Sequence, residues 1–139
     1  LNMANTKVMG RPLFGGITAG QAAYDATGAF VGDDRAEVTR RVSDSELLRV
    51  DMSGPEAFGA DADNLFVVVQ RIADDLIADP SALDTHLAAL DEAFKHMQGA
   101  VADIGARASR LEQAEQVNLD RELTLRAQLD AGDITQHHP

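Results

Sequence analysis

A glycine-rich segment near the N-terminus is the first candidate for a binding site in this sequence. The run Gly15-Gly16-Ile17-Thr18-Ala19-Gly20 holds enough glycine to bring backbone N–H groups against a phosphate. It lacks the Lys-Ser or Lys-Thr ending of a phosphate loop, and it does not open a helix as a dinucleotide-binding fingerprint does. The segment therefore indicates a flexible crossing between two parts of the chain.

Two further places in the sequence have carboxylate or imidazole side chains that could bind a metal ion. Asp61 and Asp63 resemble the opening of a calcium loop, but Ile72 stands where the closing Glu should be. Helix capping is the predicted role of these two carboxylates. His86 and His96 are ten residues apart, whereas a spacing of three or four brings two helical imidazoles to one metal. The sequence therefore predicts no metal site.

Catalytic chemistry has no positive signal in the rest of the chain. The absence of Cys excludes disulfides, thiolate zinc sites and thiol nucleophiles, and no nucleophile-elbow motif supports a serine site. His137 and His138 lie in a short polar tail, residues 133–139, which we expect to be disordered. We therefore expect a protein that is not an enzyme, with no catalytic residue and no cofactor.

Charge and composition exclude further classes of function. The formal net charge is −11, with 23 acidic and 12 basic residues, which argues against a nucleic-acid surface. No apolar run approaches the roughly 20 residues that span a bilayer, so membrane insertion is not expected. Aromatic residues make up 4% and Trp is absent, so the core must rely on aliphatic side chains, which favours long helices.

The first part of the chain predicts a small β-rich unit behind a helical end. Residues 1–8 could be the last two turns of a helix that stops at Gly10 and Pro12, with a crossing segment that ends at residue 16. Residues 17–58 are punctuated by glycine and predict four short strands. The pairs are 22–26 with 29–31, around Thr27-Gly28, and 37–42 with 47–52, around the polar turn 43–46.

The second part, residues 59–132, predicts two helices. The run 61–64 offers several N-caps for a helix over 65–78, with Leu65, Val69, Ile72 and Leu76 on one face. The β-branched residues 67–69 could equally form a strand, but the length of the periodic pattern favours helix. Ser81, with Asp84 three positions later, resembles a capping box that opens a helix over about 81–131.

An apolar seam along the second helix is the strongest pattern in the sequence. Its spacing alternates between four and three, which is typical of a coiled coil, over Leu83, Leu87, Leu90, Phe94, Met97, Val101, Ile104, Ala108 and Leu111. Such a seam can be plain core or an assembly surface, and its length favours a mixture of both. The helix over 65–78 is too short to cover it, so we expect the missing partner in the rest of a longer protein. The predicted fold class is α+β, with long antiparallel helices and a β-rich insertion.

Several pieces of the chain, in this order, resemble one known family. Residues 10–16 read Gly-Arg-Pro-Leu-Phe-Gly-Gly after Leu-Asn-Met-Ala-Asn-Thr at 1–6, and the motif positions are Leu13, Phe14, Gly15 and Gly16. Residues 52–59 read Met-Ser-Gly-Pro-Glu-Ala-Phe-Gly, with motif positions Gly54, Phe58 and Gly59. The runs 64–66, 104–107 and 110–112 complete the set. Together they resemble flagellar hook-associated protein 3 of the flagellin-like superfamily, although Pro12 stands where that family usually has Tyr.

The resemblance implies a structural adaptor that joins hook to filament at the hook–filament junction and serves motility. It implies a secreted, extracellular protein of the bacterial flagellum, exported by the flagellar secretion apparatus. The implied partners are hook-associated protein 1, flagellin, a flagellar export chaperone and, for the full-length protein, other copies of itself. The chain would be an internal fragment without the two terminal core segments. Flagellin itself, as the filament subunit, and a helical binding or chaperone module are the alternatives.

Overall fold

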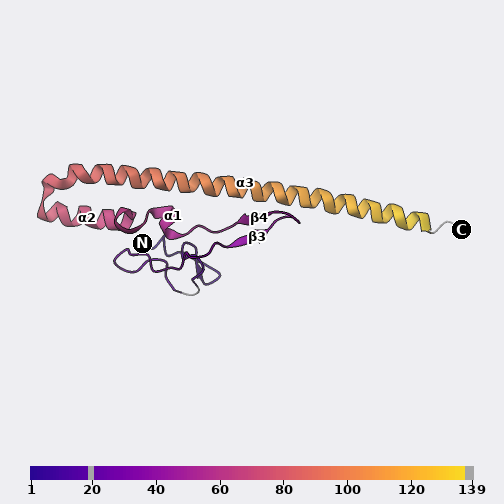
Figure 1. Ribbon diagram of the computed structural model, residues 1–139, viewed down its shortest axis with the longest axis horizontal. Helices are drawn as coiled ribbons and strands as arrows, with labels where there is room; N and C mark the ends of the chain where they lie inside the picture. The colour runs from indigo at the N-terminus through magenta and orange to yellow at the C-terminus, as the bar shows by residue number, and fades with distance from the viewer. Residues whose placement is uncertain (19–20, 137–139) are drawn as a thin grey trace.

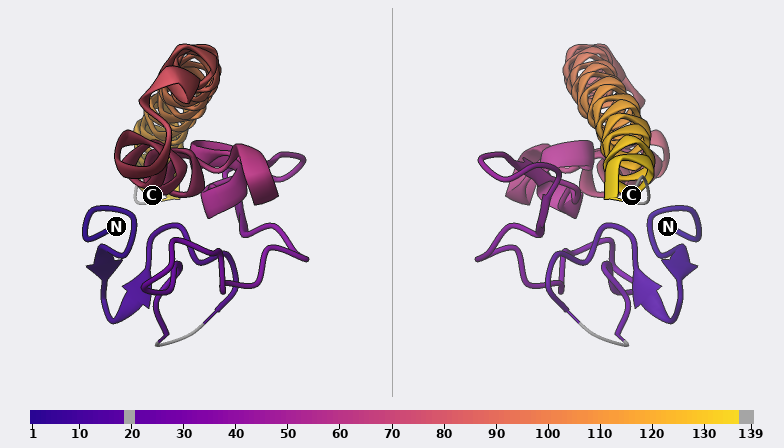
Figure 2. Two further views of the ribbon diagram at one scale, coloured as in Figure 1. Left: turned by 90° about the vertical axis from the view of Figure 1, so that its left-hand side faces the viewer. Right: turned by 90° about the vertical axis from the view of Figure 1, so that its right-hand side faces the viewer.

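The computed structural model describes residues 1–18 and 21–136 and has an α+β fold. Figure 1 shows one long helix, α3 (Leu83–Gln136), with the other elements arranged along part of one side of it. The antiparallel helix α2 (Leu65–Ala78) comes first, followed by the short helix α1 (Gly54–Phe58) and a β-hairpin. Seen along its axis in Figure 2, the N-terminal segment forms a separate layer beneath the helices.

Helix α2 has the bounds that the sequence predicts, because polar residues set both of its ends. The Asn64 side chain accepts a hydrogen bond from the Phe66 N–H at 2.9 Å, so it is the N-cap. Asp61 and Asp63, the expected caps, instead form a 3-10 turn, η1 (Asp61–Asp63). The predicted face is partly wrong, because Val69 and Leu76 are exposed. Leu65 and Ile72 of that face are partly covered, and Val68, next to it, is buried.

The turn from α2 to α3 differs from the predicted capping box. Asp79 accepts hydrogen bonds from the Ser81 N–H at 3.1 Å and from Ser81 Oγ at 2.5 Å. It thereby opens a 3-10 turn, η2 (Pro80–Ala82), and α3 begins directly after it at Leu83. Asp79 therefore performs the capping role that the sequence suggested for Ser81 and Asp84.

The C-terminal end of α3 lies beyond the predicted one. The helix runs to Gln136, whereas the sequence suggested an end near Gly132 and a disordered tail from residue 133. A single glycine costs a helix only about 1 kcal/mol, and no proline follows before Pro139, so nothing in the sequence stops the helix at Gly132. His137 and His138 lie outside the described residues.

The expected helical end at residues 1–8 is wrong. One turn, closed by the Asn5 N–H to Leu1 carbonyl bond at 3.0 Å, leads into β1 (Lys7–Val8), which pairs antiparallel with β2 (Arg11–Pro12). Asn5 ties this turn to a distant part of the chain, because both ends of its amide bind the Tyr24 backbone. Its Nδ2 donates to the Tyr24 carbonyl and its Oδ1 accepts from the Tyr24 N–H, each at 2.8 Å.

Of the two predicted strand pairs, one is confirmed and the other is reduced to a single bridge. The strands β3 (Thr39–Arg41) and β4 (Leu47–Arg49) pair antiparallel, with Arg40 opposite Leu48. In the other pair, only Tyr24 and Phe30 form an antiparallel bridge. The predicted turn is present there, since Gly28 has a φ of +84° and its N–H donates to Asp25.

The core of the N-terminal segment is a cluster of aromatic rings around Tyr24, which is 1% exposed. The Tyr24 ring makes edge contacts with three other rings, at centroid distances of 5.5 Å to Phe30, 6.0 Å to Phe58 and 4.8 Å to Phe66. Because Phe58 and Phe66 belong to α1 and α2, the cluster joins the N-terminal layer to the helices. Burial raises the pKa of Tyr24 to about 12, so its hydroxyl stays neutral.

Replacing Gly54 with Ala is expected to lower the free energy of unfolding by roughly 1–3 kcal/mol. A Cβ at Gly54 would lie 2.5 Å from the Tyr24 hydroxyl oxygen, and the Tyr24 ring cannot retreat because it is packed on several sides. Gly105→Ala is the matched control. A Cβ there meets nothing within 4 Å, so this helical position should gain about 0.5–1 kcal/mol. Urea titration of both variants checks the prediction, and equal shifts would contradict it.

Candidate functional site

The two glycine-containing motifs of the sequence, Leu13–Gly16 and Gly54–Gly59, meet in the folded chain. The Phe14 and Phe58 rings are 5.0 Å apart at their centroids, and the Gly54 N–H donates to the Phe14 carbonyl at 2.8 Å. Gly54 itself lies against the Tyr24 ring. These positions therefore join the N-terminal layer to α1, and their contacts are structural.

The glycine-rich segment has a structural use in its described part. Gly16 has a φ of +64°, and a Cβ there would lie 2.1 Å from the Asp33 carbonyl oxygen. The backbone on either side of it pairs with the same residue: the Ile17 N–H donates to Asp33, and the Asp33 N–H donates to Gly15. Glycine is thus required for a close approach of two backbone segments. Ala19 and Gly20, which complete the predicted crossing, lie outside the described residues.

The apolar seam on α3 has two flanks with different environments. The inner flank, formed by His86, Ala89, Ala93 and Ala100, faces the rest of the chain, and Ala93 is only 6% exposed. The outer flank, formed by Leu87, Phe94 and Val101, is 64%, 58% and 69% exposed. Small side chains on the inner flank let α2 approach closely, and the large seam residues therefore turn outward. The residues of the predicted seam are therefore divided between a covered side and an exposed side of α3.

Between the two flanks, the remaining seam residues are partly covered. Leu83, Leu90 and Met97 are half-buried. Farther along α3, Ile104 and Leu111 line an apolar groove of about 350 Å³ between α3 and the segment that contains β4. Further lining residues are Leu13, Phe14, Leu48 and Met52. The groove therefore brings together residues from the seam and from the first glycine-containing motif.

An arginine network fixes the hairpin against the helices. The Arg49 guanidinium binds both carboxylate oxygens of Glu56, each at 2.6 Å, and reaches Asp51 at 2.9 Å and Glu37 at 3.2 Å. From α3, Arg107 donates to the Asp51 carbonyl at 2.6 Å and also binds Asp103. This bidentate, partly buried arrangement holds β4, α1 and α3 in one geometry.

Acidification should weaken this network through Glu56. The Arg49 guanidinium, helped by the Ser53 N–H, lowers the pKa of Glu56 to about 2. Because the unfolded value is higher, about 4.3, the stabilisation is complete above that value and is lost as the pH falls toward 2. We expect the free energy of unfolding in urea to fall from pH 7 to pH 3, and to fall less in Glu56→Gln. The control Glu46→Gln removes a carboxylate outside the network and should keep the wild-type difference. An unchanged difference in Glu56→Gln would contradict the assignment.

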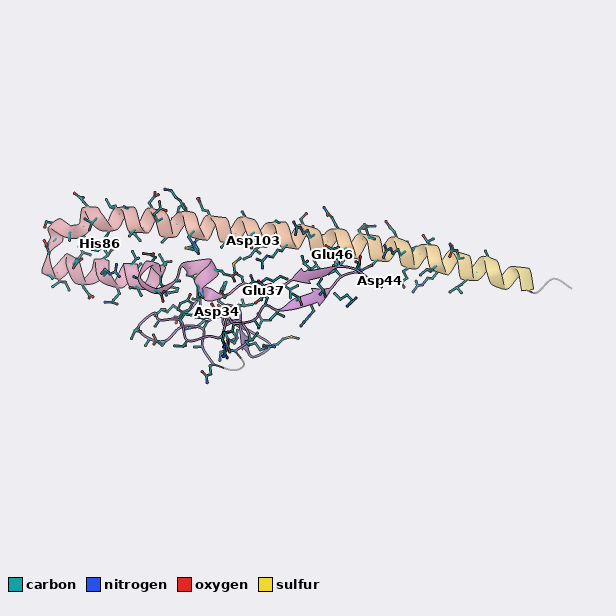
Figure 3. All side chains as sticks on the ribbon, viewed as in Figure 1. Asp34, Glu37, Asp44, Glu46, His86 and Asp103 are labelled. Atoms are coloured by element: carbon teal, nitrogen blue, oxygen red, sulfur yellow. The ribbon has the colours of Figure 1, made fainter. Side chains whose placement is uncertain are left out.

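The histidines of α3 serve contacts within the chain. Figure 3 shows His86 in the space between α2 and α3, where its Nε2 lies 2.5 Å from Asp75 Oδ2. His96 Nε2 lies 3.2 Å from the Pro55 carbonyl oxygen of α1. Across residues 1–18 and 21–136, no group of three or more His, Asp and Glu side chains is placed to hold a metal ion. In the same range, no helix is both long enough and apolar enough to span a membrane.

Comparisons with known proteins give a likeness among solved structures. No protein-family profile and no curated protein sequence matches the chain. Among solved structures, it is similar to a protein from Vibrio parahaemolyticus that is described, provisionally, as a flagellar hook-associated protein. The TM-score is 0.74 at 20% sequence identity, over 94% of this chain. The two chains share a fold. The chain spans 61% of the length of that protein.

Sequence reasoning missed the inner flank and the arginine network. A signal for the flank exists, because His86, Ala93, Ala100, Arg107 and Ala114 follow one another at intervals of seven. The three alanines of this row, at heptad spacing, predict close approach of a partner beside the apolar row. The arginine network carries no comparable signal, since Arg107 and its acceptor Asp51 are 56 residues apart.

Proposed function

We propose that this chain is part of a structural adaptor of the bacterial flagellum, which joins hook to filament by packing of subunits and performs no catalysis. The observation that carries the proposal is the outer flank of α3, where Leu87, Phe94 and Val101 are exposed in one row. A row of large apolar side chains at heptad spacing is suited to packing against further helices. The shared fold with a flagellar hook-associated protein supports the same role.

The seam serves two purposes in this proposal. Leu83, Leu90 and Met97 contribute to the core with α2, while the outer flank packs against other parts of the full-length protein or against neighbouring copies. Ile104 and Leu111 hold the segment before α1 against α3. We assign the β-rich residues 17–58 to an outer domain. The N-terminal part of the chain before β3 lies in the layer beneath the helices in Figure 2, whereas the β3–β4 hairpin and α1 pack against α3.

The proposed location is the extracellular junction between hook and filament, reached through the flagellar secretion apparatus. The proposed partners are hook-associated protein 1 on the hook side and flagellin on the filament side, with an export chaperone before secretion. The acidic surface, with a formal net charge of −11, keeps single copies soluble before they assemble.

Immunogold electron microscopy of detached flagella tests this location. Antibodies are raised against the 139-residue chain and absorbed against purified filament, so that antibodies to shared helices are removed. The proposal predicts gold at a single point where the hook meets the filament. Gold along the whole filament would instead make the protein a flagellin, and flagella without gold would favour a binding or chaperone module.

A further inference from the structure

A shallow groove lies where the tip of the β3–β4 hairpin meets α3. It has a volume of about 280 Å³, and Asn118 holds its two sides together by donating to the Val42 carbonyl at 2.9 Å. Its apolar floor is made by Val42, Ala114 and Val117, and Arg110 and Arg121 lie at its two ends. These arginines are eleven residues apart, about three helical turns, so they project from the same face of α3. We call this site the arginine groove.

Several arginines at and beside the arginine groove have no carboxylate partner. Within the part of the chain that the structure describes, Arg40, Arg41, Arg110 and Arg121 form no ion pair with a carboxylate. The guanidinium groups of Arg40 and Arg41 donate only to backbone carbonyls, those of Thr39 and Asp44. Arg110 and Arg121 line the groove together with one carboxylate, that of Glu46, and Arg40 and Arg41 belong to β3 beside it. Four unpaired arginines in so acidic a chain suggest that an acidic surface binds there.

The opposite charge gathers at the corner between α2 and α3. Residues 72–94 contain six Asp and Glu residues and neither Lys nor Arg. Asp74 and Asp84 have no ion pair within the described residues, and the Asp79 carboxylate caps the turn. Ile77, three residues after Asp74 on α2, is 89% exposed, so the corner also presents a large apolar side chain. We call Asp74, Ile77, Asp79 and Asp84 the acidic corner.

We propose that the acidic corner of one copy docks on the arginine groove of a second copy. Ile77 enters the groove above Ala114 and Val117, while Asp74 and Asp84 approach Arg110 and Arg121. Each surface has an apolar centre and a charged rim, and the two rims have opposite sign. The contact deepens the proposed assembly role and rests on it, because it names the surfaces through which copies meet.

Geometry excludes a contact of the groove with the corner of its own chain. Asp84 and Arg110 belong to the same continuous helix, and 26 residues of helix separate them by roughly 40 Å. Figure 1 shows α3 running straight between the two regions. The acidic corner can therefore reach only the groove of another copy. Since the two surfaces differ, the contact is heterologous and generates a line or a ring of subunits.

The charges at this contact also select the relative orientation of the two copies. Copies with a formal charge of −11 repel one another in most orientations. Docking through the arginine groove brings unpaired guanidinium groups against unpaired carboxylates and replaces repulsion by attraction. The apolar outer flanks of α3 can then pack between copies that already have one relative orientation.

Disulfide trapping between copies of the whole 139-residue chain tests the contact, because the chain has no Cys of its own. One preparation carries Ile77→Cys and a second, of different mass, carries Val117→Cys. We expect their mixed disulfide to form at least fivefold faster than that of Ile77→Cys with Leu129→Cys, a control beyond the groove that is more exposed than Val117, at 73% against 48%. Equal rates for the two mixtures would overturn the proposal.

Charge reversal on the same two preparations tests the electrostatic rims. Arg110→Glu with Arg121→Glu in the Val117→Cys partner should reduce trapping to the control rate. Adding Asp74→Lys and Asp84→Lys to the Ile77→Cys partner should restore it, and circular dichroism checks that the helices are intact. An unchanged rate of disulfide trapping in both charge-reversed mixtures would refute the contact. Gold labelling at the junction without specific trapping would leave the proposed function standing and remove only this contact.

Discussion

Tyr24→Ala is expected to lower the free energy of unfolding by about 3–5 kcal/mol, the usual loss for a large buried aromatic side chain. The ring is 1% exposed and touches Phe30, Phe58 and Phe66, which come from the N-terminal layer, α1 and α2. Removing the ring leaves a cavity where these elements meet. Urea denaturation followed by circular dichroism measures the loss, because α1 and α2 depend on the cluster.

Tyr24→Phe is the matched control for this result. The Tyr24 hydroxyl is buried and has no hydrogen-bond partner within the described residues, so its removal deletes an unsatisfied polar group and keeps the ring. We expect a change of less than about 1 kcal/mol, toward higher stability. A loss from Tyr24→Phe as large as that from Tyr24→Ala would show that the hydroxyl, rather than ring packing, supports the cluster.

Two neighbouring positions on α3, Ala93 and Phe94, should lose very different amounts of stability when each is replaced by Asp. Ala93 is 6% exposed on the inner flank, so Ala93→Asp buries an unpaired charge and should lower the free energy of unfolding of the chain by more than about 2 kcal/mol. Phe94 is 58% exposed on the outer flank, so Phe94→Asp should change it by less than about 1 kcal/mol.

Urea titration of the 139-residue chain measures both variants on the same helix, one residue apart. The comparison separates core from free surface, since both substitutions place the same charge at adjacent helical positions. Equal losses would mean that the outer flank is covered within the chain. The proposed packing role for Leu87, Phe94 and Val101 would then have no free surface.

The sequence predicted the ends of a helix correctly where a polar residue caps that end. Helix α2 begins and ends as expected because Asn64 caps one end and Asp79-Pro80 closes the other. The helical end at residues 1–8 was wrong, since residues 7–8 pair with 11–12 and the Asn5 amide binds the backbone of Tyr24. Both are tertiary or pairing contacts that helix propensity cannot anticipate.

For the candidate site, periodicity found the seam but not its orientation. The rows of large and small side chains lie one position apart, at Phe94 and Ala93, and the pattern alone favours the large ones as the buried row. The chain buries the small ones because α2 and α1 must approach α3 closely. The meeting of residues 13–16 with 54–59 depends on the path of the intervening chain, so the residues alone did not predict it.

Quantitative immunoblotting of detached flagella tests most directly whether the outer flank of α3 serves assembly. Cells produce the full-length protein either unchanged or with Phe94→Asp and Val101→Asp, and the protein is measured relative to the hook subunit. We expect the unchanged protein in the flagella, and the variant at background level there but folded and present in the culture medium. Variant protein in the flagella at the unchanged level would contradict the proposed packing role.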